Sequence, residues 1–406
     1  MTGNQTSELP VFDEAFATDP HSHYARLRPE APVHRIRAYS GFPLWIVTRY
    51  AEARQVLADP RFAKNFQRVS DLIESQLPPD ADGRKFSADL GAHMLNMDPP
   101  DHTRLRKLVV KAFTARRVEA LRPRIEEITA ELLDRIEGRP AADLIDEFAF
   151  PLPIKVITEL LGVDESRRDE FREWSNVLVD SSDQQAIETA SEQMKDYLVE
   201  LLGKKRAQPG DDLLTALIEA EDDHDRLTEG ELIAMVFLLL VAGHETTVNL
   251  IGNCVLALLT NQDQLAALRA DLDLVDGAIE ETLRFESPVM QSTFRYTTEA
   301  AEIGGVEIPA DQVVWVALGS ANRDGERFED PEVFDIRRTT TGHLAFGHGI
   351  HFCLGAPLAR MEGQIAVRRL LERFPDLALD GPADDLRWRV SNLMRGLEEL
   401  PVRTGA

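Results

Sequence analysis

The sequence predicts a mainly α-helical protein with a smaller β-rich part, and three observations point to this fold class. Apolar residues recur at helical spacing through most of residues 101–283. The most apolar stretch begins at Thr228 and continues without a proline to about Thr260, enough for one helix about 45 Å long. After Pro288 the pattern changes to short β-type runs between glycine and proline turns.

The individual elements follow from local patterns. Two β-leaning runs around Ser40 and Gly41 predict a hairpin over residues 33–48. Helical spacing predicts one helix over 116–137 and two helices over 166–207, which break near Ser181. Thr228 and Glu231 form a capping box at the start of the long apolar helix. Further predictions are short strands in 293–298, 301–308 and 313–316 and a last helix from about Gly355 to Phe374.

Composition excludes several classes of protein. The 406 residues include 70 acidic and 45 basic side chains, a net charge of −25 that argues against binding nucleic acid or an anionic membrane. Two cysteines do not make a disulfide framework. Residues 1–20 lack a signal-peptide pattern, and the apolar run 232–243 is shorter than the ~20 residues of a spanning helix. With no linker in sight, we expect one cytoplasmic domain over residues 1–406.

The segment from Phe346 to Gly355 is the most informative part of the chain. It holds three glycines, which allow tight turns and close approach to a flat ligand, together with two histidines and Cys353. Cys353 precedes a predicted helix, whose unpaired N–H groups and dipole favour a thiolate. A thiolate is a soft, strongly donating metal ligand. Cys254 has no such surroundings and is interpreted as a core residue.

The pattern Phe346-Gly-x-Gly-x-His351-x-Cys353-x-Gly355 resembles the haem-binding loop of cytochromes P450, the haem-thiolate monooxygenases. The resemblance extends over nearly the whole chain and implies the cytochrome P450 fold with haem b as cofactor. It also implies that Cys353 is the axial ligand of the iron, where a thiolate favours O–O cleavage. Phe346, His351 and Gly355 are then haem-binding positions of the same loop.

The long apolar helix contains a second motif, Ala242-Gly243-His244-Glu245-Thr246. A glycine in mid-helix costs ~1 kcal/mol relative to alanine, and a carboxylate in apolar surroundings costs more unless it is paired. Ala242, Glu245 and Thr246 have the i, i+3, i+4 spacing of one helix face. The motif resembles the oxygen-activation signature of the family, which implies haem contact at Ala242 and Gly243, proton relay by Glu245 and a hydrogen bond from Thr246. A satisfied core carboxylate is the alternative interpretation of Glu245.

Two further sets of charged residues match the family. His102 and Arg106, at i and i+4 of one helix, with Arg295 and His351, match its donors to the haem propionates, since buried carboxylates need charge-assisted hydrogen bonds. Glu281 and Arg284 match its Glu-x-x-Arg motif, and we expect Arg327 to complete a structural triad with them. In the segment of Arg327, Gly325 stands where the family usually has proline.

A basic segment interrupts the acidic chain. Residues 102–124 contain eight Lys and Arg against the single acidic residue Glu119. A solvated helix face is one interpretation, and a docking patch for an acidic electron donor is the other. By resemblance we expect a small ferredoxin, reduced by an NAD(P)H-dependent ferredoxin reductase. We see no flavin or nicotinamide fingerprint in the chain.

The resemblance is strongest to the actinobacterial subfamily that hydroxylates macrolides and other bulky secondary metabolites, which also includes members acting on steroids and vitamin D. It implies O₂ as co-substrate and a hydrophobic small molecule, macrolide, polyketide or steroid-like, that is hydroxylated or epoxidised. Substrate contacts are expected from separate segments whose apolar character favours such a ligand. They include Val241, Val289, Gln291, Ser292 and Met394.

Three other functions remain open at this point. A zinc site could use Cys353 with His343, His348 and His351, but this spacing fits no common zinc pattern and leaves Glu245 and Thr246 unexplained. A haem protein without catalysis, such as a gas sensor, lacks a need for the acid and alcohol pair. A peroxide-driven peroxygenase is a further alternative, although such relatives lack this pair.

Overall fold

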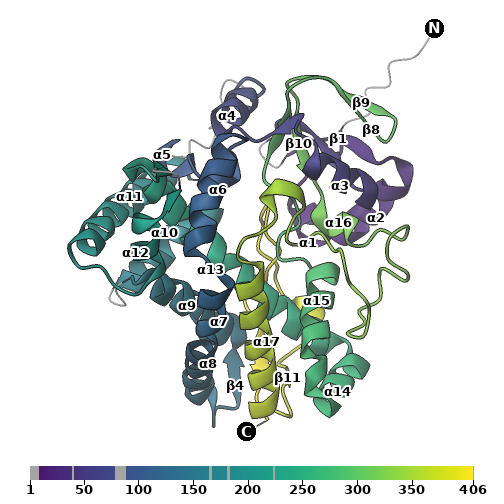
Figure 1. The fold of residues 1–406 in the computed structure, drawn as a ribbon. Coiled ribbons are helices and arrows are strands. Elements are labelled where there is room, and N and C mark those ends of the chain that lie inside the picture. Colours follow the sequence, from purple (N-terminus) through teal and green to yellow (C-terminus); the bar gives the residue numbers. More distant parts are fainter. Residues whose placement is uncertain are drawn as a thin grey trace.

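Helix α13 (Glu229–Thr260) passes through the middle of the protein in the computed structural model, and the other elements surround it (Figure 1). The structure describes residues 9–38, 41–77, 88–163, 167–180, 183–222 and 225–405. The predicted capping box is present at its start: Thr228 Oγ1 accepts from the Glu231 N–H, and Glu231 Oε2 accepts from the Thr228 N–H at 2.8 Å. The prediction of one long buried helix is confirmed.

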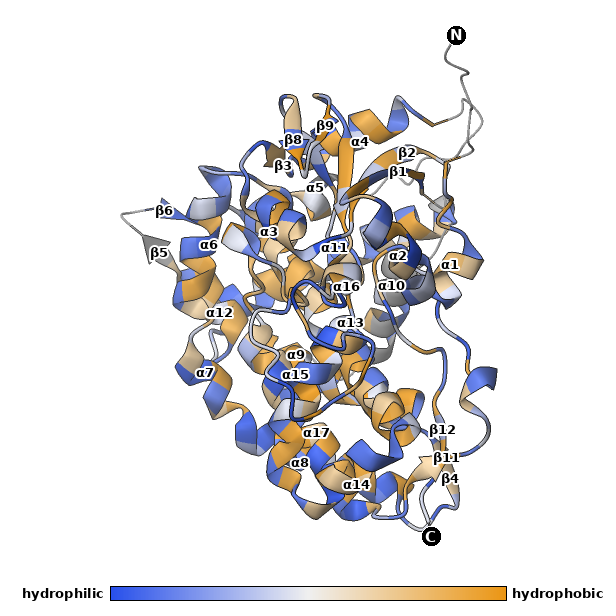
Figure 2. Cartoon of the chain, turned by 90° about the vertical axis from the view of Figure 1, so that its right-hand side faces the viewer, coloured by the Kyte–Doolittle hydropathy of each residue, from blue (hydrophilic) through white to orange (hydrophobic). Residues whose placement is uncertain are grey.

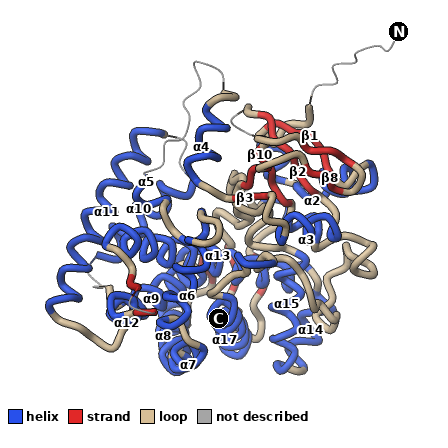
Figure 3. Tube along the Cα trace, turned by 45° about the horizontal axis from the view of Figure 1, so that its top comes forward, coloured by secondary structure: helices blue, strands red, loops and turns tan. Residues whose placement is uncertain are grey.

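Helices fill most of the volume, and strands gather at one end of it (Figure 3). Apolar and polar residues alternate along the helices, as expected of elements that pack on one side only (Figure 2). Apart from α13, the α-helices among the described residues are α1 (Glu14–Thr18), α2 (Pro20–Glu30), α3 (Tyr50–Ala58), α4 (Phe66–Glu74), α5 (Ala88–Gly91), α6 (Asp101–Ala112), α7 (Ala115–Ala120), α8 (Arg122–Ile136), α9 (Pro151–Leu161), α10 (Arg168–Asp180), α11 (Gln184–Ala207), α12 (Leu213–Glu219), α14 (Gln262–Ala270), α15 (Val275–Phe285), α16 (Leu318–Ala321) and α17 (Ala356–Arg373).

The β-rich part is centred on a five-stranded sheet of order β1-β2-β10-β7-β3. The predicted hairpin forms its edge, because β1 and β2 pair antiparallel, and β10 joins β2 in parallel. The strands of this sheet are β1 (Val33–Arg37), β2 (Pro43–Val47), β3 (Phe62–Ala63), β7 (Arg295–Thr297) and β10 (Val313–Val316). The smaller sheets contain β4 (Ala141–Asp143), β5 (Glu221–Asp222), β6 (Asp225–Arg226), β8 (Ala301–Ile303), β9 (Val306–Ile308), β11 (Ala378–Leu379) and β12 (Pro401–Arg403).

One sequence prediction for the helices is wrong in detail. The helix expected over 116–137 is two helices, α7 and α8, because the chain turns at Leu121 and Pro123 occupies the first turn of α8. Proline is favoured there because its missing N–H is not needed in a first turn. The two helices expected over 166–207 are α10 and α11, and Ser181 and Ser182, near which they were expected to break, lie outside the described residues.

α13 is long and apolar enough to cross a membrane if length and composition alone are considered. In the fold it is a core helix: 61% of its most apolar 18-residue window is buried inside the protein. The largest hydrophobic cluster packs around it and includes side chains of α8, α9, α11, α15 and α17. A helix in a protein core has to be apolar on all sides, so it can be as long and as apolar as a helix that spans a membrane.

Candidate active site

The loop before α17 holds Cys353 in a fixed backbone conformation. The Cys353 N–H donates to the Phe346 carbonyl at 2.9 Å, which closes the loop around the 3₁₀ turn η5 (Gly349–His351). Gly349 has a φ of +73°, and a Cβ there would lie 2.9 Å from the Leu57 carbonyl oxygen on α3. Glycine is therefore required at this position both for its backbone angle and for the close approach.

The sulfur of Cys353 faces the start of α17, as predicted. The N–H groups of Gly355 and Ala356 donate to it, and the residue as a whole is exposed. Burial of the sulfur raises the pKa of the Cys353 thiol, while these N–H groups, Arg106 and Arg360 act in the opposite direction. The N–H groups at the start of α17 therefore favour the thiolate, as predicted, while burial opposes it. Coordination to iron would act in the same direction as the N–H groups, because a coordinating thiol is deprotonated outright.

One turn of α13 is open although the helix around it is buried. Ala242 is exposed, and Val241, Gly243 and Thr246 are partly exposed. The Thr246 hydroxyl donates to the Ala242 carbonyl at 3.0 Å. This turn therefore leaves the small side chain of Ala242 and the Thr246 residue accessible, in a helix that is otherwise mostly buried.

Glu245 does not share this open face, in contrast to the prediction from spacing. Its side chain is completely buried, and Oε2 lies 2.9 Å from Nη1 of Arg389, in the chain segment before β12. The other oxygen, Oε1, lies 3.4 Å from Nε2 of His244 and finds no hydrogen-bond partner among the described residues. Consecutive helix positions differ by about 100°, so Glu245 and Thr246 point in different directions.

The four predicted propionate donors lie together. His102 and Arg106 are on α6, Arg295 is on β7 and His351 is in the cysteine loop. The rings of His102 and His351 are 4.4 Å apart, and Arg106 donates to the Phe352 carbonyl at 2.8 Å. Both ring nitrogens of His102 and Nε of Arg295 are buried without a hydrogen-bond partner among the described residues. These donor atoms are therefore available for an anionic ligand, and Asp98 is a carboxylate whose charge acts on both His102 and Arg295.

Two basic residues that the sequence did not single out join this group. Lys64 follows β3 and is 4% exposed, and His93 precedes a 3₁₀ turn and is 5% exposed. Burial and the charge of Lys64 lower the pKa of His93 to about 4. The one signal in the sequence is a lysine directly after the apolar pair Phe62-Ala63. We call these six residues the basic cluster: Lys64, His93, His102, Arg106, Arg295 and His351.

These features fit a haem better than a zinc ion. A flat macrocycle with two carboxylates can use the exposed Cys353, the small residues of α13 and the unpartnered donors of the basic cluster. The zinc alternative needs His343, but its Nε2 lies 3.1 Å from Glu280 Oε2. The described residues contain no group of three or more His, Cys, Asp and Glu side chains arranged to hold a metal ion.

The structural triad forms with a different arginine from the one predicted. Glu281 and Arg284 are completely buried and make two hydrogen bonds of 2.7 and 2.8 Å. The third member is Arg338, whose Nε donates to Glu281 Oε1 at 3.2 Å. Arg327 instead donates to the Thr341 carbonyl and lies over the ring of Phe328. The prediction for Arg327 is therefore wrong. The spacing of residues in the sequence does not show which arginine of the following loop contacts Glu281 after folding.

The predicted substrate contacts divide into two groups. Val241, Val289 and Met394 are partly exposed, and the backbones of Val289 and Met394 pair in an isolated bridge. Gln291 and Ser292 are buried and serve the fold: the Gln291 amide donates to the Tyr24 hydroxyl at 2.7 Å, and Ser292 Oγ accepts from the Val316 N–H at 3.1 Å. We therefore retain only the first three as proposed substrate contacts.

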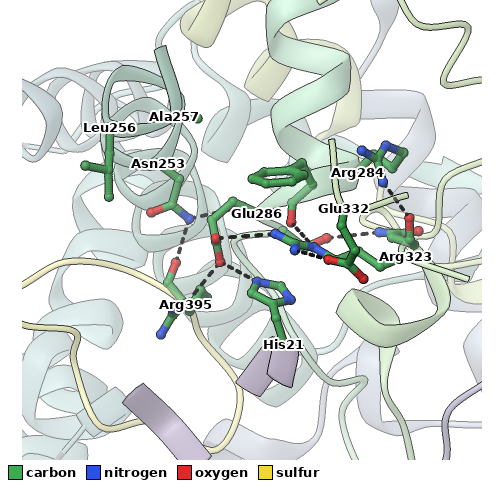
Figure 4. Close-up of polar contacts among 12 residues, drawn as sticks. His21, Asn253, Leu256, Ala257, Arg284, Glu286, Arg323, Glu332 and Arg395 are labelled. Carbon is green, nitrogen blue, oxygen red and sulfur yellow. Dashed lines mark hydrogen bonds and ion pairs between the residues drawn. The ribbon is translucent and has the colours of Figure 1, made fainter. Parts of the chain in front are cut away.

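A buried ion-pair network surrounds Glu286 (Figure 4). It lies next to the segments of Val289 and Met394, because the Arg395 N–H donates to the Pro288 carbonyl at 2.8 Å. Glu286, directly after α15, binds His21 at 2.9 Å and Arg395 at 3.0 Å, with Arg323 at 3.8 Å. Burial opposes the charged form, but the charges of His21, Arg395 and Arg323 hold the pKa of Glu286 well below its usual range. The network therefore connects the N-terminal helix α2, the end of α15 and the segment that follows Met394.

The basic segment 102–124 is less positive in the fold than in the sequence. Arg104 pairs with Asp225 and Glu231, and Arg124 pairs with Glu159. Arg117 and Arg122 also have carboxylate partners. Lys107 and Val110 are exposed on α6, and Arg106 of the same helix contacts the cysteine loop. A count along the chain could not include carboxylates that come from other elements.

Comparisons with known proteins agree with this geometry. A family model described as Cytochrome P450 matches residues 154–381. The chain is 68% identical to cytochrome P450 107B1 of Saccharopolyspora erythraea, over all of both chains, and 46% identical to the 6-deoxyerythronolide B hydroxylase of the same organism, over 96% of this chain and 97% of the relative. The solved structure of the tirandamycin C-bound P450 monooxygenase TamI superposes with a TM-score of 0.91, at 51% identity, over 97% of this chain and all of that chain.

Proposed function

Because this chain belongs to the cytochrome P450 family, we propose that it is a ferredoxin-dependent monooxygenase that hydroxylates or epoxidises a bulky hydrophobic small molecule. The family assignment itself makes it a haem-thiolate monooxygenase with haem b, which uses O₂ and a redox partner. Bound through a cysteine thiolate, the haem supplies the chemistry that inserts one oxygen atom into a C–H or C=C bond. The overall reaction consumes one O₂, two electrons and two protons for each oxygen atom inserted, and the second oxygen atom leaves as water.

The chain's own residues have distinct tasks in this reaction. Cys353 would bind the iron, and the four donors expected from the sequence, His102, Arg106, Arg295 and His351, would bind the propionates. Phe346 carries Arg360 over its ring at 4.5 Å, and Gly355 donates to the sulfur, so both keep the cysteine loop in shape. The exposed Ala242 leaves room for the macrocycle beside α13, while Gly243 lets α9 approach the helix, because a Cβ there would lie 3.1 Å from Ile157. Thr246 holds a proton at Oγ1 on the open face, where it can be donated toward the reacting oxygen.

The buried ion pair of Glu245 and Arg389, directly before the open-face hydroxyl of Thr246, is the observation that carries the proposal. Glu245 is completely buried, but its partner Arg389 is 24% exposed, so the ion pair extends from the helix toward solvent. A carboxylate that swings from Arg389 toward Thr246 would bring a proton from outside to the open face. A haem protein for sensing, or a peroxygenase that receives its protons with the peroxide, has no need for such an arrangement.

The substrate class rests on the walls of the site and on the relatives. Val241, Val289 and Met394 are apolar and come from three separate segments, which favours a large hydrophobic ligand. The relatives are named for 6-deoxyerythronolide B and tirandamycin C. We propose a macrolide, another polyketide or a steroid-like molecule as substrate, oxidised by one cytoplasmic domain over residues 1–406.

The electron donor would dock beside Cys353. Phe352 and Ile350 are 43% and 49% exposed in the cysteine loop, and Val110 is 44% exposed on α6. Lys107, Lys111 and Arg116 are exposed near them along the chain of α6 and α7. Apolar side chains surrounded by cations suit a small acidic iron–sulfur ferredoxin, since complementary charge raises the rate of association.

The test of the proton pair compares two threonines of α13. With ferredoxin, its NAD(P)H-dependent reductase and a compound that shifts the haem spectrum on binding, Thr246→Ala should consume NAD(P)H but release peroxide in place of product. Thr260 is the matched control, because its hydroxyl also donates to the carbonyl four residues earlier, that of Leu256 at 2.8 Å. If Thr246→Ala forms product as efficiently as Thr260→Ala, the proposed role of the pair is wrong.

The docking surface has a separate test. Lys107→Glu should slow electron transfer from ferredoxin about tenfold at low salt and less at high salt, because steering charges are screened. Lys204→Glu on α11, at a side chain that is 67% exposed, provides the control for charge reversal elsewhere. Equal rates in the two variants would contradict docking at α6, and full activity with peroxide but none with ferredoxin would favour the peroxygenase alternative.

A further inference from the structure

Lys64 is a buried lysine held by two contacts. Its backbone N–H donates to both carboxylate oxygens of Asp98, at 2.9 and 3.0 Å, and its ammonium donates to the Thr293 hydroxyl. The register of β3 and β7 pairs Ala63 with Tyr296, so the next position places Lys64 beside Arg295. Burial and the charge of Arg295 lower the pKa of Lys64 well below its usual range. A lysine in this setting needs an anion nearby.

The surroundings of Lys64 indicate where that anion belongs. Its charge acts on His93, His102 and His351, which come from three different segments. Several of these neighbours have unpartnered donor atoms: His93 Nδ1, both nitrogens of His102 and Nε of Arg295 find no hydrogen-bond partner in the described part of the chain. Lys64 thus belongs to a group of neighbouring basic side chains, several of which have buried donor atoms available to a ligand.

The formal charges of this group, counted with Lys64 protonated, match the cofactor. Lys64, Arg106 and Arg295 are cations, and Asp98 is the carboxylate that acts on Lys64, Arg295 and His102. The surplus is two positive charges, equal to the two propionates of haem b. Without Lys64, a single surplus charge would face two buried carboxylates, an arrangement that costs free energy unless each charge is paired.

We propose that Lys64 binds a haem propionate and completes the charge balance of the cofactor, with Thr293 orienting its ammonium and Asp98 fixing its backbone. This assignment depends on the haem and is independent of the proposed substrate and electron donor. A lysine at this position also raises the reduction potential of the iron, because a nearby cation favours the state with one more electron.

The experiment measures haem retention and reduction potential in the purified holoenzyme. Lys64→Met should transfer haem to excess apomyoglobin about tenfold faster than the wild type. It should also lower the equilibrium constant for reduction of the iron by up to about tenfold, which is a fall of about 59 mV in the one-electron reduction potential. Lys64→Gln should shift both quantities in the same direction, and Lys64→Arg, which keeps the charge, should stay within about twofold of the wild type. Asp98→Asn should shift the potential upward.

The control is a second buried lysine outside the basic cluster. Lys155 on α9 has a side chain that is 8% exposed and pairs with Glu131 at 3.5 Å. Lys155→Met removes a buried charge and should leave both readouts unchanged. In each variant the reduced carbon monoxide spectrum shows that Cys353 still ligates the iron. The proposal is overturned if Lys64→Met keeps wild-type haem transfer and potential, or if it loses only the spin-state response to ligands with a carboxylate, which would make Lys64 a substrate contact.

Discussion

Replacing Arg389 with methionine should destabilise the protein by up to about 3.7 kcal/mol at pH 7 and by only about 1 kcal/mol at pH 5. The reason is the completely buried Glu245, whose Oε2 lies 2.9 Å from the Arg389 guanidinium. In the variant the carboxylate either stays charged without this partner or takes up a proton. An unpaired buried charge typically costs about 3–5 kcal/mol. Because the carboxyl group can avoid this cost by taking up a proton, the free energy of protonation is the upper limit of the destabilisation.

The size of this upper limit follows from the pKa that a glutamic acid has in the unfolded chain. A glutamic acid in water has a pKa of about 4.3, and each pH unit above this value adds about 1.36 kcal/mol to the free energy of protonation. The free energy is therefore about 3.7 kcal/mol at pH 7 and about 1 kcal/mol at pH 5. The destabilisation should fall with pH along this line, which a loss of packing alone would not do.

Urea unfolding followed by circular dichroism at both pH values measures this difference. Arg387→Met is the matched control, because Arg387 is 69% exposed and pairs with Glu398 at the surface, where such pairs contribute less than about 1 kcal/mol. The series is repeated in a His244→Phe background, because a protonated imidazole at 3.4 Å could replace the arginine. A cost that is the same at pH 5 and pH 7 in this background would refute the reasoning.

Three further predictions concern other contacts. Arg338→Met should cost about 1.5–3 kcal/mol, the value of a hydrogen bond to a charged group, and Arg327→Met should cost less; equal urea midpoints would contradict the triad with Arg338. Because the pKa of Glu286 is depressed in the folded state, its stabilisation is present above the unfolded value of about 4.3 and is lost as pH falls below it. Glu286→Gln should therefore unfold more easily than the wild type at pH 7, and the difference should begin to shrink at about pH 4.3 and continue to shrink as the pH falls toward the much lower folded pKa. Parallel pH profiles would show that Glu286 is not responsible. Cys353→Ser should abolish the carbon monoxide spectrum typical of thiolate-ligated haem while its far-ultraviolet circular dichroism stays helical, and a retained spectrum would exclude Cys353 as the ligand.

The fold was predictable where the signal is local. The capping box at Thr228, the apolar run to Thr260 and the proline at the start of α17 all act within a few residues, and each element was found at the expected place. The prediction failed between Arg116 and Glu137, because apolar spacing continues across the break at Leu121. Hydrophobic periodicity indicates which residues are buried. When two consecutive helices pack on the same core, their apolar spacing can continue from one to the other, so the spacing does not show where the first helix ends.

The site was predictable only in part, for a related reason. Motifs singled out Cys353, Thr246 and the four expected propionate donors as candidates, and the structure places the four donors close together. The partner of Glu281, the ion pair of Glu245 and the place of Lys64 depend on residues far away in the chain. Arg338, Arg389 and Asp98 are separated from these partners by dozens of residues, and no local pattern selects them.

The amino-acid sequence alone determined that this protein has a long buried helix, a glycine-rich cysteine loop and the residues of a haem-thiolate enzyme, because helix periodicity, turns and ligand chemistry are properties of neighbouring residues. Only the tertiary structure decided which charges meet. An ion pair needs two groups within about 4 Å after the chain has folded, and with 115 charged residues the sequence allows far more pairings than the fold can form. Long-range packing selects among them, and so it decided the third arginine of the triad, the partner of the buried acid and the membership of the basic cluster.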